Sequence, residues 1–249
     1  MFSQLPKATI FAHRGASVYA PENTLAAFEA AVQQHADAIE LDAKLTADRQ
    51  VVVIHDQTVD RTTNGSGEVR KMSLEAIREL DAGSFFDVQF KGEKIPLLSE
   101  VFEAVGKRIF INIELTNYAS LIDELPFLVV ALVKQFNLHA RVMFSSFNPI
   151  ALWRVKHQLP EVPVGLLAQP GKSGAWARSW LSGLLRHEAL HPEKRDANPS
   201  LVQKVHRSGR RVYVYTVNQP QEMQQLFQIG VDGIFTDDPL LAQQARKTD

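Results

Sequence analysis

The chain has 249 residues, enough for one large domain or two small ones, and its apolar fraction of 45% excludes a wholly disordered protein. Lysine and arginine number 27 against 28 aspartates and glutamates; this net charge of −1 argues against a nucleic-acid partner, because phosphate contacts require a surplus of basic residues. Cysteine is absent, which excludes disulfides, thiolate metal sites and cysteine nucleophiles.

No segment of the sequence predicts export or insertion into a membrane. The N-terminal stretch 1–10 has no apolar run long enough for a signal peptide. The longest apolar stretch, 125–133, contains Pro126 and is too short to span a bilayer. We therefore expect a cytoplasmic protein that does not insert into membranes.

The first third of the chain begins with a strand, a helix and a hairpin. Residues 8–12 are apolar and β-prone, and Asn23 or Thr24 then caps a predicted helix. The segment 38–45 alternates as a strand, and a second β-branched run at 51–54 follows it after a link too short for a crossover helix. We therefore expect these two runs to form an antiparallel hairpin.

After the hairpin, the polar stretch from about 57 to 93 interrupts the pattern and is expected to be an insertion. Six further strands are then predicted at 109–114, 142–144, 164–167, 189–191, 212–216 and 233–235. Helices are predicted between them at 97–106, 120–136, 149–158, 175–186, 199–208 and 220–229, and the tryptophans in these helices, Trp153, Trp176 and Trp180, are expected to pack. Eight strands with helical connections predict a TIM (β/α)₈ barrel in a single domain, 1–249, with a doubly wound sheet as the alternative.

Acidic residues occupy the strands whose ends should form the mouth of such a barrel. Glu40 and Asp42 are two apart on one strand, so both side chains point to the same face. Their apolar neighbours point to the helix layer, which directs the carboxylates inward, and Glu114 repeats this arrangement. Because we assign no lysine as a partner of these three carboxylates, we expect a divalent cation bound by oxygen ligands. A buried ion network is the alternative.

Two histidines and an arginine are expected beside these carboxylates. The hairpin turn is centred near residues 48 and 49, which places Asp42 opposite or nearly opposite His55. His13 ends the neighbouring first strand, and Arg14, whose guanidinium suits a phosphate, follows it. Two imidazoles that flank a cation suit acid–base catalysis. The alternative is that His55 is itself a metal ligand. Together these groups predict phosphoryl chemistry.

The ordered set of motifs resembles the glycerophosphodiester phosphodiesterase family, over nearly the whole chain from about residue 8 to Pro239. The motifs are His13-Arg14-Gly15, Pro21-Glu22-Asn23-Thr24, Glu40-Leu41-Asp42, His55-Asp56, Asn112-Ile113-Glu114 and the stretch Tyr213–Asn218. Any one of them is a weak signal, whereas their order and spacing together are specific.

This resemblance implies a TIM barrel with an inserted segment after the second strand. It also implies the cleavage of small glycerophosphodiesters to glycerol 3-phosphate and an alcohol, with Mg²⁺ or Ca²⁺ as the cofactor. We expect a cyclic phosphate on the way, because a glycerol hydroxyl already lies next to the ester. The implied roles are metal binding for Glu40, Asp42 and Glu114, acid–base catalysis for His13 and His55, and phosphate contact for Arg14.

Two positions depart from the family pattern. A lysine is common two residues after the third metal-binding glutamate, where this chain has Thr116. Thr116 can donate a hydrogen bond but has no charge, so the phosphate would depend more on Arg14 and the cation. Tyr215 stands where a tryptophan is common, and with Thr116, Phe147 and Asn218 it forms the expected substrate pocket.

Two other functions stay open on the sequence. One is a phospholipase D-like lyase on the same barrel, which would stop at a cyclic phosphate from a lysophospholipid. The other is a barrel without catalytic activity that binds phosphate esters. The sequence does not identify the preferred alcohol group, the preferred cation or the oligomeric state.

Overall fold

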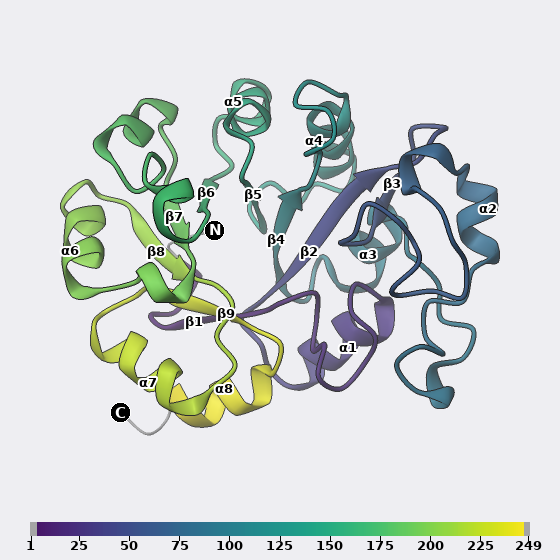
Figure 1. The fold of residues 1–249 in the computed structure, drawn as a ribbon, viewed down its shortest axis with the longest axis horizontal. Coiled ribbons are helices and arrows are strands. Elements are labelled where there is room, and N and C mark those ends of the chain that lie inside the picture. Colours follow the sequence, from purple (N-terminus) through teal and green to yellow (C-terminus); the bar gives the residue numbers. More distant parts are fainter. Residues whose placement is uncertain (1–3, 247–249) are drawn as a thin grey trace.

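Eight parallel strands close into a barrel in the computed structural model, which describes residues 4–246 (Figure 1). Strand β1 pairs with both β2 and β9, which closes the ring and excludes an open, doubly wound sheet. The predicted TIM barrel is therefore confirmed. Its strands are β1 (Thr9–Ala12), β2 (Ala38–Leu45), β4 (Phe110–Leu115), β5 (Val142–Ser146), β6 (Val164–Ala168), β7 (Ala189–Pro192), β8 (Arg211–Val214) and β9 (Gly233–Thr236).

Helices lie outside the ring of strands and cover its apolar face (Figure 1). They are α1 (Leu25–Gln33), α3 (Leu98–Val105), α4 (Leu125–Gln135), α5 (Pro149–Gln158), α6 (Pro199–Arg207), α7 (Pro220–Gln228) and α8 (Pro239–Arg246). The side chain of Thr24 caps α1 by accepting a hydrogen bond from the Ala27 amide. None of the helices in this part of the chain combines the length and apolar character that crossing a bilayer requires.

The predicted hairpin after the second barrel strand is confirmed. Strand β3 (Val51–Val53) pairs with β2 in antiparallel fashion, with Ala43 opposite Val53. The Ile54 amide donates to the Asp42 carbonyl at 2.9 Å, so Ile54 lies opposite Asp42 and His55 comes one residue later. His55 is thus nearly opposite Asp42, because the turn is centred on residue 48 rather than between 48 and 49.

Between β3 and α3 the chain leaves the barrel and forms only short helices. These are η2 (Val69–Lys71), α2 (Leu74–Glu79) and η3 (Val88–Phe90), and the segment lies beyond β3 at one side of the barrel (Figure 1). It packs on the hairpin through a small apolar cluster of its own, which includes the buried side chains of Val52, Val69 and Ile77.

The prediction of an α-helix at 175–186 is wrong. This segment forms turns and the 3₁₀ helix η5 (Trp180–Leu185), and another 3₁₀ helix, η4 (Gly171–Gly174), comes directly before it. Ser179 Oγ donates to the Trp176 carbonyl and accepts from the Leu181 amide, and such side-chain bonds compete with an α-helix. The expected packing of the tryptophans is also wrong, because Trp153, Trp176 and Trp180 are 59%, 41% and 74% exposed.

A buried histidine just before β7 links the stability of the fold to pH. The His187 side chain is buried, and its Nε2 accepts a hydrogen bond from Arg210 Nη1 at 2.6 Å. Burial, together with the Arg210 charge, lowers the pKa of His187 to about 4. As the pH falls from 6.5 toward 4, the unfolded chain therefore takes up a proton that the folded protein does not, and stability is lost.

We expect His187→Gln, which keeps an acceptor for Arg210, to escape this loss. Relative to the wild type, its free energy of unfolding should rise by about 3 kcal/mol as the pH is lowered from 7 to 4. Urea unfolding of both proteins at several pH values measures this difference. The contributions of the other titrating groups to the free energy of unfolding cancel in the comparison. A difference that does not change with pH would contradict the interpretation.

Candidate active site

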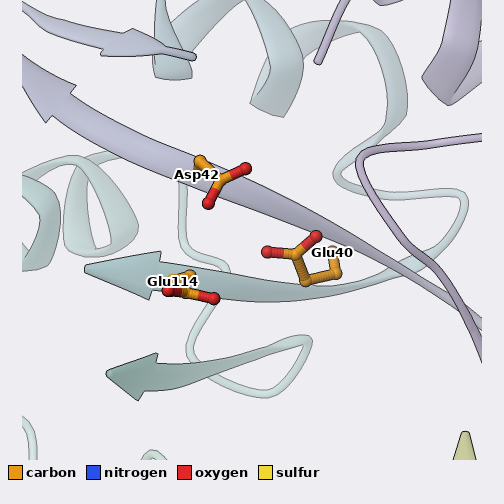
Figure 2. Close-up of side chains that lie close together, drawn as sticks. All are labelled: Glu40, Asp42 and Glu114. Atoms are coloured by element: carbon orange, nitrogen blue, oxygen red, sulfur yellow. The ribbon is translucent and has the colours of Figure 1, made fainter. Parts of the chain in front are cut away.

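Three carboxylates from two neighbouring strands meet inside the mouth of the barrel (Figure 2). Glu40 and Asp42 extend from β2, and the strand register places Glu114 of β4 beside Asp42. One oxygen of each carboxylate lies within 4.8 Å of the others. Glu40 and Asp42 are 2% and 1% exposed, so water screens this cluster of like charges poorly.

The unpaired atoms of this cluster fit a hard cation. Glu40 Oε1 and the side-chain oxygen of the adjacent Asn112 are buried without a hydrogen-bond partner among the described residues. Burial and the Asp42 charge raise the pKa of Glu114 to about 8, and burial with the Asp42 and Glu114 charges raises the pKa of Glu40. A divalent cation would bind these oxygens and offset the repulsion between the carboxylates. The residues present therefore suit a divalent cation.

Asp42 differs from the two glutamates because it has partners. Asn23 Nδ2 donates to its Oδ2 at 2.9 Å, and Arg14 Nε lies 3.4 Å from the same oxygen. Burial acts to raise the pKa of Asp42, but the charges of Arg14 and His55 and the Asn23 bond outweigh it and hold the pKa below its usual value. Asp42 therefore stays ionised within the cluster.

Each of the two predicted histidines is held by an aspartate. His13 Nδ1 lies 2.6 Å from Asp237 Oδ1, and His55 Nδ1 lies 2.6 Å from Asp56 Oδ1. An aspartate on Nδ1 fixes the orientation of the ring and leaves Nε2 for a proton transfer. Asp237 directly follows β9, so its place at the end of a barrel strand was the signal available in the sequence for this role.

Arg14 joins the carboxylate cluster to the histidines through a network of ion pairs. Its Nη1 donates to Glu22 at 2.9 Å, and Arg61 from the segment after β3 bridges Glu22 and Asp56. Burial acts to lower the pKa of Arg14, but the charges of Asp42, Glu22 and Glu40 raise it above the usual value. The guanidinium is therefore a permanent cation beside the mouth.

Both histidines, Arg14 and the two glutamates of the carboxylate cluster line one cavity of about 290 Å³. Of the predicted pocket residues, Phe147 and Tyr215 line it too, whereas Thr116 lines a neighbouring cavity of about 80 Å³. Asn218 supports His13 indirectly. Its Nδ2 donates to Asp237 Oδ2 at 2.5 Å, and the other oxygen of Asp237 holds His13. The residues that line the larger cavity are His13, Arg14, Glu40, His55, Asn112, Glu114, Ser145, Phe147, Leu167, His191, Tyr215, Thr216 and Phe235.

The sequence reasoning missed His191, which lies fully buried on β7 and lines this cavity. Neither ring nitrogen has a hydrogen-bond partner among the described residues, and burial lowers the pKa of His191 to about 3, so the imidazole is neutral. The His191 ring fits here because residue 165 is a glycine: a Cβ at that position would lie 2.3 Å from His191 Nε2. The inward alternation of β7 was the available signal.

The sequence reasoning also took no lysine as a neighbour of the carboxylates, and this was wrong. Lys44 lies two residues after Asp42 on the same face of β2 and is 5% exposed. Its Nζ donates to the Thr116 hydroxyl at 2.9 Å and to the Thr116 carbonyl at 3.3 Å. The alternation that directs Glu40 and Asp42 inward applies equally to Lys44.

Known proteins resemble this chain over almost its full length. A glycerophosphodiester phosphodiesterase of Caldanaerobacter subterraneus is 44% identical over 236 residues, which cover 94% of this chain and 95% of the relative. The structure of an Oleispira antarctica phosphodiesterase, in complex with the product sn-glycerol-3-phosphate, superposes with a TM-score of 0.90 at 32% identity, covering 99% and 98% of the two chains.

A glycerophosphodiester phosphodiesterase structure from Agrobacterium tumefaciens is similar as well, with a TM-score of 0.83 at 31% identity, covering 95% of this chain and 99% of the other. The model of the glycerophosphoryl diester phosphodiesterase family matches residues 13–241, which include all the carboxylates and both histidines of the barrel mouth. With this match and a relative of 44% identity, the chain belongs to the glycerophosphoryl diester phosphodiesterase family.

Proposed function

We propose that the barrel mouth hydrolyses glycerophosphodiesters to glycerol 3-phosphate and an alcohol, with one divalent cation, Mg²⁺ or Ca²⁺, held by Glu40, Asp42 and Glu114. The observation that carries this proposal is the meeting of three carboxylates, within 4.8 Å of one another, beside a cavity that both histidines line. The product bound by the Oleispira relative, sn-glycerol-3-phosphate, supports the choice of substrate.

In this proposal, Arg14 and the three carboxylates prepare the site for an anionic substrate. A bound cation would supply a Lewis acid for a phosphoryl oxygen. Arg14 already pairs with Glu22 and Asp42 and lines the cavity, so it offers a fixed positive charge to a second phosphate oxygen. Phe147 and Tyr215, whose rings contact at 6.0 Å between centroids, form an apolar wall beside the phosphate.

His13 and His55 are the proposed acid–base pair. One imidazole takes the proton from the glycerol hydroxyl next to the ester, and that oxygen attacks phosphorus. The bond from phosphorus to the departing alcohol then breaks, and the other imidazole donates its proton to the alcohol oxygen. Water opens the resulting cyclic phosphate with the two roles exchanged. Asp237 and Asp56 hold the rings throughout, since each accepts from Nδ1.

The segment after β3 has a part in this arrangement. Arg61 pairs with both Asp56 and Glu22, so it supports His55 on one side and Arg14 on the other. We therefore propose that residues 1–249 act as one catalytic domain, with the insertion at about 57–93 as the support of the hairpin histidine.

Phosphorus NMR of the reaction products tests the proposed function. With glycerophosphocholine we expect glycerol 3-phosphate as the final product, formed only with a divalent cation and stopped by a chelator. With a lysophospholipid, a cyclic phosphate as the end product would instead favour the lyase. Full activity in the presence of the chelator, or no turnover of any phosphodiester, would contradict the proposal.

A further inference from the structure

Lys44 is a buried cation for which the reaction proposed above has no role. It is the only buried lysine among residues 4–246. Burial lowers the pKa of its ammonium group below the usual value, and the negative charges of Asp42, Glu114 and Asp56 oppose this decrease. Burying an ammonium group is costly unless nearby negative charge compensates it, so the position of Lys44 calls for an electrostatic explanation.

The contacts of Lys44 hold its charge in a fixed place without neutralising it. Both of its described hydrogen bonds go to Thr116, one to the hydroxyl and one to the carbonyl. The Thr116 hydroxyl in turn donates to the Ala43 carbonyl at 2.7 Å, so its own proton is not available to a substrate. Lys44 and Thr116 line the neighbouring cavity of about 80 Å³, so the ammonium group acts on Asp42 and Glu114 through its charge and not by a direct contact.

A count of charges shows what this ammonium group changes. Three carboxylates and a divalent cation would carry one net negative charge, and the adjacent Arg14 is itself paired with Glu22. Lys44, whose described hydrogen bonds both go to Thr116, adds one positive charge near Asp42 and Glu114, which favours the anionic phosphodiester. Negative charge grows on the phosphoryl oxygens in the transition state, and a fixed positive charge stabilises it most where water is excluded.

We propose that Lys44 is a positioning residue that offsets one carboxylate of the cluster, so that the barrel mouth attracts the phosphodiester and stabilises the charge of its transition state. The inference rests on the proposed function. Because Lys44 repels a divalent cation, its effect on cation binding is opposite in sign to its effect on phosphate binding. This difference in sign separates an electrostatic role from a purely structural one.

The test is Lys44→Gln, which removes the charge and keeps a donor for Thr116. We expect kcat/KM for glycerophosphocholine to fall by about 10- to 100-fold, less than for a donor that contacts the reacting oxygen directly. Calorimetry should show divalent cation binding as tight as in the wild type or tighter. Inhibition by glycerol 3-phosphate should weaken, whereas inhibition by glycerol should not change.

Two further variants complete the design. Lys134→Gln removes the same charge from an exposed position on α4 and should match the wild type. The double variant Lys44→Gln with Thr116→Lys returns an ammonium group from the residue that follows β4, since Thr116 Oγ1 lies 2.9 Å from Lys44 Nζ. We expect the double variant to recover at least about 10-fold of the loss, because the charge is restored near its original place.

Three results would overturn the inference: wild-type kcat/KM in Lys44→Gln, a joint loss of activity and cation binding in that variant, or no recovery in the folded double variant. A failure of the proposed function is seen separately, in the wild type. A wild type that does not turn over phosphodiesters, or does so without a cation, contradicts the function. A cation-dependent wild type with an unaffected Lys44→Gln variant contradicts only the inference.

Discussion

Replacement of Glu40, Asp42 or Glu114 by its amide is expected to lower kcat/KM for glycerophosphocholine by about 1,000-fold or more, since a lost metal site removes several kcal/mol of transition-state stabilisation. Calorimetry with Mg²⁺ and with Ca²⁺ should show that cation binding is lost or strongly weakened in each variant. A coupled assay for glycerol 3-phosphate measures the activity.

Thermal unfolding of the metal-free proteins distinguishes this effect from misfolding. Burial and repulsion raise the pKa of Glu40, so Glu40→Gln removes an unfavourable interaction and should be at least as stable as the metal-free wild type. Glu29→Gln is a matched control, because Glu29 lies on α1 and pairs with Arg108 outside the barrel. Undiminished cation binding in the three active-site variants would contradict the assignment of the ligands.

Replacement of His13 or His55 by alanine should lower kcat by about 100-fold or more, because each variant lacks one proton transfer. Divalent cation binding should persist in both variants. If His55→Ala loses cation binding, His55 is a ligand instead, as the sequence left open. His157→Ala, at an exposed position on α5, is the control. Near-full activity of both His13→Ala and His55→Ala would show that the acid–base assignment is wrong.

A change of leaving group identifies which histidine is the acid of the first step. An ester of glycerol phosphate with p-nitrophenol releases an alcohol that needs no proton, so in a rapid-mixing measurement of the first step the variant that lacks this acid should release p-nitrophenol nearly as fast as the wild type. The variant that lacks the base should lose as much activity as on glycerophosphocholine. The two variants are therefore expected to separate on this substrate and to be alike on the natural one.

The number of alternating strand and helix segments predicted the barrel, but only the pairing of β1 with β9 excludes the doubly wound sheet. A buried parallel strand exposes one face to helices and one to the interior, so the inward direction of Glu40 and Asp42 follows from their spacing. The hairpin was predicted from the short link between its strands, and its register places His55 nearly opposite Asp42, within the range that this link allowed.

Other parts of the site depend on contacts between distant residues, which no local pattern contains. Asp237 reaches His13 across 224 positions of sequence, and Asn218 reaches Asp237 from the loop after β8. Lys44 could have been found, because it shares the face of Asp42, but its contact with Thr116 depends on the register between β2 and β4. The segment 175–186 has helical composition, yet its serines bond to the backbone instead.

Crystals of the protein soaked in Mn²⁺ would locate the cation by its anomalous scattering. We predict one strong peak between Glu40, Asp42 and Glu114, with an oxygen of each at about 2.0–2.6 Å, the range of hard divalent cations. The peak should vanish in Glu40→Gln with Asp42→Asn. No peak at the barrel mouth, or a peak bound elsewhere in the molecule, would show that these carboxylates do not form the metal centre of this phosphodiesterase.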